Sequence, residues 1–98
     1  MNELSGFQRD LLYVIAGLGN PSGMAVKTEL ENYYETEVNY GRLYPNLDTL
    51  VGKDLIEKGH KDRRTNEYTL TRGGRREIDA HQDWKSQYVD SVEAPLAD

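Results

Sequence analysis

The stretch YGRLYPNLDTL, residues 40–50, decides the fold of this 98-residue chain. Projected at about 100° per residue, its leucines fall on one face of a helix, and its small and polar residues fall on the other. Asn39 stands directly before it as a typical N-cap. We therefore predict a helix with Tyr44 and Asn46 on its flanks. The inward residues are Leu43, Leu47, Leu50 and Val51, and the outward residues are Gly41, Arg42, Pro45, Asp48 and Thr49.

Pro45 is unusual inside this helix, because proline lacks an N–H and clashes with the carbonyl group four residues earlier. That residue is Gly41, whose missing side chain allows the backbone to relax. We therefore expect a helix that is bent or that begins late.

Two further helices precede this stretch. Ser5 and Gln8 have the spacing of a capping box, and apolar residues at steps of three and four continue to Leu18. Ser22 is the candidate cap of a second helix, which continues to about Tyr34.

A hairpin and a long helix follow. Residues 55–58 and 68–70 read as short strands on either side of a polar tip, which predicts a β-hairpin. Thr71 is the candidate cap of the last helix. No linker or internal repeat separates these elements, so we predict one domain over residues 1–92 and a flexible tail at residues 93–98.

The order of helix, helix, helix, hairpin and helix is that of a winged helix-turn-helix, and two motifs resemble the PadR-like transcriptional regulators. The family pattern Gly-x-Leu-Tyr-Pro-x-Leu-x-x-Leu is matched by residues 41–50, and Tyr-x-Leu-Thr-x-x-Gly-Arg by residues 68–75. The glycine usual before Leu55 is Asp54 here. The resemblance spans about residues 7–90. It implies a mainly α (α+β) fold with three helices, a two-stranded wing and a long C-terminal dimerisation helix, in a short member without the further C-terminal helices of longer relatives.

The resemblance also implies a DNA-binding regulator of the repressor type, whose third helix enters the major groove while the wing reaches the backbone or the minor groove. Arginine can bond a guanine edge and asparagine an adenine edge. The candidate DNA contacts are Asn39, Tyr40, Arg42, Tyr44, Pro45, Asn46, Thr49, Lys61, Arg63 and Arg64. Alternatively, Tyr44 packs against the hairpin, Tyr40 is buried at the core edge, and Asn39 is a cap rather than a base reader.

The charge distribution bears on this function. The net charge of −5 argues against a nucleic-acid binder when it is taken as an average. Residues 39–76, however, carry nine basic and five acidic residues, whereas both ends are acidic. This basic middle coincides with the predicted third helix and wing, where phosphate neutralisation is needed. The alternative is that these charges only solvate the surface.

The last helix predicts a homodimer. Its aromatic residues have little left to pack on once a small winged-helix core is complete, and a two-fold dimer matches a palindromic operator. The candidate interface residues are Phe7, Leu11, Ile78, His81, Trp84 and Tyr88.

Composition excludes several other classes. The chain has no cysteine and two distant histidines, so we expect no disulfide, no metal site, no cofactor and no enzymatic activity. No apolar run is long enough for a membrane span, and we expect a cytoplasmic, nucleoid-associated protein. The runner-up function is a winged-helix module that binds proteins instead of DNA. No small-molecule effector is assigned. The acidic ends reflect either a high-salt cytoplasm or chance in a short chain.

Overall fold

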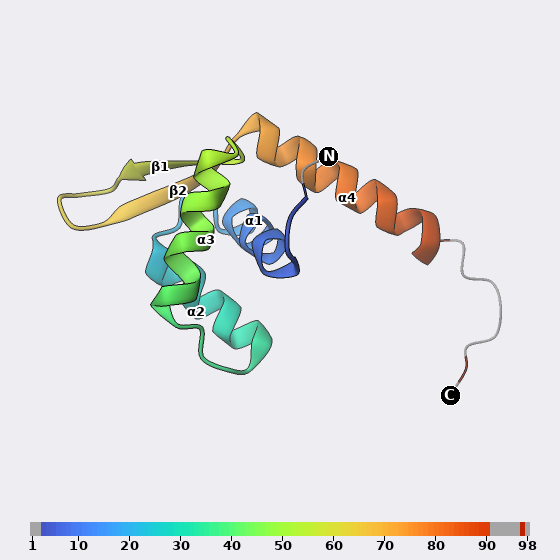
Figure 1. The fold of residues 1–98 in the computed structure, drawn as a ribbon, viewed down its shortest axis with the longest axis horizontal. Helices are drawn as coiled ribbons and strands as arrows, with labels where there is room; N and C mark the ends of the chain where they lie inside the picture. Colours follow the sequence, from blue (N-terminus) through green and yellow to red (C-terminus); the bar gives the residue numbers. More distant parts are fainter. Residues whose placement is uncertain (1–2, 91–96, 98) are drawn as a thin grey trace.

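The computed structural model describes residues 3–90 and 97. Figure 1 shows three helices packed together, a wing that extends from one side of them, and a last helix that projects from the other side. The predicted tail at residues 93–98 lies outside the described residues, apart from Ala97. The elements are α1 (Gly6–Leu18), α2 (Gly23–Tyr34), α3 (Tyr40–Gly52), β1 (Ile56–His60), β2 (Asn66–Leu70) and α4 (Arg72–Val89).

This order confirms the predicted fold class, which is mainly α with a small β wing. The two strands pair antiparallel, with Ile56 opposite Leu70 and His60 opposite Asn66. Both strands are longer than predicted, because polar residues next to the tip continue the ladder. Such residues carry no apolar alternation that would reveal a strand from the sequence.

Every helix begins at its predicted N-cap. The side chains of Ser5, Ser22, Asn39 and Thr71 each accept a hydrogen bond from the backbone N–H three residues later. Each cap satisfies one of the donors that a helix start leaves unpaired. The capping box of α1 is complete, since Gln8 also accepts from the backbone N–H of its own cap residue.

The core lies where the three helices meet the base of the wing. Leu43, Leu47 and Leu50 of α3 are fully buried, as predicted. Tyr68 of β2 is also fully buried, and its hydroxyl group has no hydrogen-bond partner among the described residues. The wing is therefore anchored in the core by an aromatic ring.

Of the two alternatives predicted for the third helix, a bend or a late start, the late start is wrong. The helix begins at Tyr40, directly after its cap, and Pro45 lies inside it. The carboxamide of Asn39 accepts from the backbone N–H of Arg42 at 2.8 Å. This bond caps the first turn of the helix, which lies before Pro45. The helix can therefore begin at Tyr40 instead of at the proline.

The base of the wing, where it meets α4, depends on the left-handed backbone of Asp54 and on the missing side chain of Gly74. Asp54 has a φ of 60°, a left-handed conformation that glycine adopts readily and that aspartate tolerates. This explains why the family glycine can be replaced here. Thr71 donates its hydroxyl to the Asp54 carbonyl oxygen at 2.6 Å. A Cβ on Gly74 would lie 2.1 Å from the Leu55 carbonyl oxygen, so only glycine fits.

Candidate nucleic-acid interface

Two tyrosines cover one flank of α3. The rings of Tyr40 and Tyr44 stack with their centroids 5.8 Å apart, and both side chains are partly exposed. Tyr44 rests on the first turn of α2, where a Cβ on Gly23 would lie 2.7 Å from the Tyr44 hydroxyl oxygen. The expected alternatives are thereby resolved: Tyr40 is not buried, and Tyr44 packs on α2.

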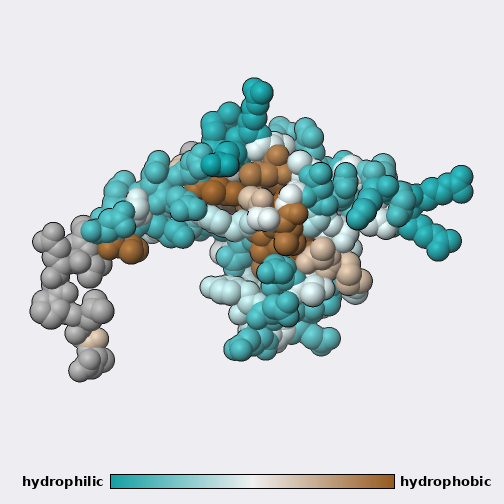
Figure 2. Space-filling view, turned by 180° about the vertical axis from the view of Figure 1, so that it is seen from behind, coloured by the Kyte–Doolittle hydropathy of each residue, from teal (hydrophilic) through white to brown (hydrophobic). Residues whose placement is uncertain are grey.

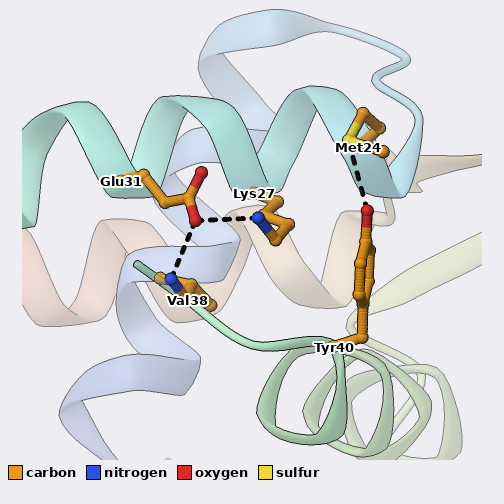
Figure 3. Close-up of polar contacts among 5 residues, drawn as sticks. All are labelled: Met24, Lys27, Glu31, Val38 and Tyr40. Carbon is orange, nitrogen blue, oxygen red and sulfur yellow. Dashed lines mark hydrogen bonds and ion pairs between the residues drawn. The ribbon is translucent and has the colours of Figure 1, made fainter. Parts of the chain in front are cut away.

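An ion pair on α2 supports this flank, and Figure 3 shows it beside Tyr40. Glu31 accepts from the Lys27 ammonium group at 2.8 Å and from the Val38 backbone N–H at 2.9 Å. These two bonds lower the pKa of Glu31, and the hydrogen bond to Glu31 raises the pKa of Lys27. The Lys27 ammonium group also lies 5.2 Å from the ring centroid of Tyr40. The turn between α2 and α3 is thus tied to α2 by a charged group.

Both predicted base readers on the opposite flank are engaged by α1. The guanidinium of Arg42 lies over the ring of Phe7, 4.0 Å from its centroid. The Asn46 carboxamide accepts from Gln8 Nε2 at 2.9 Å and donates to the Arg42 carbonyl oxygen at 2.7 Å. Arg42 remains exposed, but Asn46 has both ends of its amide in use.

The remaining predicted contacts of α3 differ in their availability. Asn39 is a helix cap, as the alternative interpretation held. Thr49 donates its hydroxyl back to the Pro45 carbonyl oxygen at 3.0 Å. Asp48, which is absent from the predicted contacts, is exposed on the same outward face, and its charge contributes, after burial and Tyr44, to the raised pKa of Tyr68.

The wing tip carries the predicted basic residues. Lys61, Arg63 and Arg64 are all exposed. Asp62 organises the tip, because its Oδ1 atom accepts from the backbone N–H groups of Arg64 and Thr65 at 2.9 Å each. The first of these bonds is the main cause of the lowered pKa of Asp62.

A hollow of about 420 Å³ lies between the start of α2 and the wing, next to the wing tip. Arg64 of the wing tip and Tyr44 on the flank of α3 therefore border one concave surface. The hollow is lined by Ser22, Gly23, Met24, Tyr44, Arg64, Thr65 and Asn66.

The predicted dimer residues fall into two groups. Phe7, Leu11 and Ile78 pack in the core of the single chain, with exposed fractions of 7%, 0% and 7%. A side chain packed in the core of its own chain offers little surface to a partner, so these three residues are weaker candidates for the interface than the other group. The periodicity of α1 identified an apolar face but not which element covers it.

The other group forms an aromatic row on α4. The rings of His81 and Trp84 stack at 6.0 Å, and Trp84 contacts Tyr88 edge-on at 5.3 Å. Trp84 and Tyr88 are 50% and 59% exposed. A hydrogen bond of 3.0 Å joins His81 Nδ1 to the hydroxyl of Tyr13 on α1. Burial, together with the charges of nearby basic residues, lowers the pKa of His81.

Two other kinds of site are absent from residues 3–90 and 97. No group of three or more His, Asp or Glu side chains there could hold a metal ion. None of the helices in that part of the chain has the length and apolar character needed to cross a membrane.

The sequence of residues 11–80 matches the transcriptional regulator PadR-like family. The chain belongs to this family. The match confirms the resemblance drawn from the α3 and wing motifs. Members are DNA-binding transcription factors and not enzymes, so the chain has a role in DNA-binding transcriptional regulation. No curated protein sequence shows a significant match.

Solved structures agree with this assignment. RosR of H. salinarum, from crystals grown from NaBr, is 45% identical, with a TM-score of 0.85 over 96% of this chain and 83% of the RosR chain. A complex structure of hsRosR-S1 is 49% identical, with a TM-score of 0.82 over 86% of this chain and 74% of that chain. FabT of Streptococcus pneumoniae in complex with DNA shares only the fold, at 22% identity and a TM-score of 0.74 over 98% of this chain and 64% of FabT.

Proposed function

We propose that this PadR-like chain is a repressor that binds a palindromic operator in duplex DNA as a homodimer. The observation that carries this proposal is the concave surface between α3 and the wing tip. Tyr44 on the flank of α3 and Arg64 of the tip line this surface, and Lys61 and Arg63 are exposed near Arg64 in the same tip. The outward face of α3 suits the major groove, and the cations suit phosphates or the minor groove.

The contacts divide by chemistry. Tyr40 and Tyr44 donate to phosphates from the flank of α3, and the wing cations neutralise phosphates on the other side of the groove. Arg42 reads a guanine edge by turning away from Phe7, a movement that breaks one cation–π contact. Asn46 supports α3 through its bonds to Gln8 and to the Arg42 carbonyl oxygen and is not itself a base reader.

The homodimer rests on the aromatic row of α4. Trp84, Tyr88 and Val89 are large side chains with half or more of their surface exposed. α4 projects from the body of the single chain (Figure 1). Figure 2, which shows the molecule from behind the view of Figure 1, shows that hydrophobic residues also reach the surface in the middle of that face. A second copy whose α4 lies against this side would remove both apolar surfaces from water.

A titration of duplex DNA at several salt concentrations tests the proposal. Binding should weaken steeply as salt rises, because phosphate contacts release counterions. A library of random duplexes should yield a palindromic sequence. If the chain instead bound DNA without sequence preference or salt dependence, the alternative function as a protein-binding module would gain support. Chromatin immunoprecipitation from cells, followed by sequencing of the bound DNA, then identifies the operators and the regulated genes.

The location and salt adaptation of the protein follow from this proposal. A regulator of transcription works in the cytoplasm, bound to the nucleoid. The relative RosR comes from H. salinarum, which supports reading the acidic ends of the chain as an adaptation to a high-salt cytoplasm. Circular dichroism between low and molar potassium chloride tests this, since a salt-adapted protein loses its fold at low salt.

A further inference from the structure

The outward face of α3 contains one acidic residue, and it has no structural task. Asp48 is exposed, and no hydrogen bond or ion pair among the described residues ends on its carboxylate. Side chains three and four residues away are its neighbours on the helix. These positions hold Tyr44, Pro45, Val51 and Gly52, and none of them carries a positive charge.

Three other polar side chains of this helix are engaged within the chain. Asn46 uses both ends of its amide, Thr49 bonds to the Pro45 carbonyl oxygen, and Arg42 lies over Phe7. The carboxylate of Asp48 is therefore the polar group on the outward face that is already free to meet a base.

Asp62, an exposed acid of the wing tip, differs in this respect. Its carboxylate caps the tip by accepting from two backbone N–H groups. A carboxylate on a surface that approaches phosphates lowers affinity by like-charge repulsion. Asp48 has no such bond among the described residues to offset that cost.

Resting on the proposed DNA-binding function, we propose that Asp48 is a specificity-determining residue whose carboxylate accepts a hydrogen bond from the N4 amine of cytosine in the major groove. Cytosine offers only this donor on its major-groove edge, whereas guanine and thymine offer acceptors that repel a carboxylate. Adenine offers a donor beside the acceptor N7, so one oxygen of the carboxylate is repelled there.

Binding-site selection from a random duplex library tests this role with three proteins: the wild type, Asp48→Asn and Asp83→Asn. Asp83 is exposed on α4, so its substitution makes the same change in net charge away from α3. The wild type and Asp83→Asn should select cytosine at one position of each half-site. Replacement of that cytosine by guanine should weaken wild-type binding by about 5- to 150-fold. For Asp48→Asn the same replacement should cost less than about threefold, and binding to random DNA should become tighter because a repelled charge is gone.

Three outcomes are possible. Loss of the cytosine preference in Asp48→Asn alone supports the assignment. A library profile of Asp48→Asn that equals the wild-type profile overturns it and leaves the proposed function standing. A wild type that selects no sequence overturns the proposed function and, with it, this role of Asp48. Asp48→Ala, with thermal unfolding as the control for folding, separates loss of the carboxylate from a new contact made by asparagine.

Discussion

Gln8 and Asn46 join the first helix to the recognition helix through a hydrogen bond of 2.9 Å between Gln8 Nε2 and Asn46 Oδ1. The bond connects residues that are 38 positions apart in the chain. It orients the carboxamide of Asn46 so that its amino group donates to the Arg42 carbonyl oxygen.

Gln8→Ala removes this link and leaves a partly buried acceptor on Asn46. The free energy of unfolding should fall by about 0.5–1.5 kcal/mol, the usual net contribution of a hydrogen bond. The substitution also removes the second partner in the capping box of α1. Urea unfolding measures the change, and Gln82→Ala on the exposed surface of α4 is the control. Equal stabilities of the two variants would contradict the role of the bond.

Gly23→Ala should lower DNA affinity, because the added methyl group would displace the ring of Tyr44 from the start of α2. We expect DNA affinity to fall by about tenfold, because the phosphate contact of Tyr44 is displaced and the stacked ring of Tyr40 moves with it. Gly17→Ala is the matched control, since its Cβ would meet no atom within 4 Å. That control should leave DNA affinity unchanged and stabilise α1 by about 0.5–1 kcal/mol. Fluorescence anisotropy with operator DNA compares the two.

Glu31→Gln should change the salt dependence of DNA binding. Glutamine can still accept from the Val38 backbone N–H, but it no longer neutralises Lys27. The released ammonium group becomes available to a phosphate, which should steepen the slope of log affinity against log salt by about one. Glu29→Gln makes the same charge change on the same helix without an ion pair among the described residues. An unchanged slope in both variants would show that Lys27 does not reach the DNA.

His81 should make the stability of the fold depend on pH. Its pKa is lowered from the ordinary value of 6.5 by burial and by the positive charges of Arg9 and Lys85, which outweigh the opposing effect of Glu77. The unfolded chain therefore binds a proton more readily than the folded chain, and stability falls as the pH drops below about 6.5. In His81→Asn this loss should be smaller, while His60→Asn on the exposed wing should follow the wild type. Thermal unfolding between pH 5 and 8 measures the profiles.

Trp84→Ala should weaken the proposed homodimer. The indole is 50% exposed in the single chain and stands in the centre of the aromatic row. A large aromatic side chain at the centre of an interface commonly contributes 2 kcal/mol or more, about a thirtyfold change in dissociation constant. Light scattering across a dilution series measures it. A wild type that is monomeric at micromolar concentration would contradict the dimer itself.

The helices, their caps and the leucine face of α3 were predictable, because they depend on residues within four positions of one another. The contacts of Arg42 and Asn46 were not, since their partners on α1 come from more than 30 residues away. Helical projection placed Arg42 outward and Asn46 on a flank, but a long side chain can return to a neighbouring helix. The burial of Phe7 and Leu11 in the core of the single chain was not predictable for a related reason, because the periodicity of α1 does not show which element covers its apolar face. The lack of an ion-pair partner for Asp48 could have been predicted, because the sequence places no cation three or four positions away from it.

The close fit of Gly74 against the Leu55 carbonyl oxygen also has a mechanical consequence. α4 has 18 residues and so is about 27 Å long. Its first half is fastened to the body of the chain by Gly74, by the buried Ile78 and by the bond of His81 to Tyr13, and its second half projects beyond that body (Figure 1). A tilt of about 5° at His81 moves the last turn of the helix by about 1 Å. The second half of α4 therefore holds its aromatic side chains at a nearly constant distance from the base of the wing.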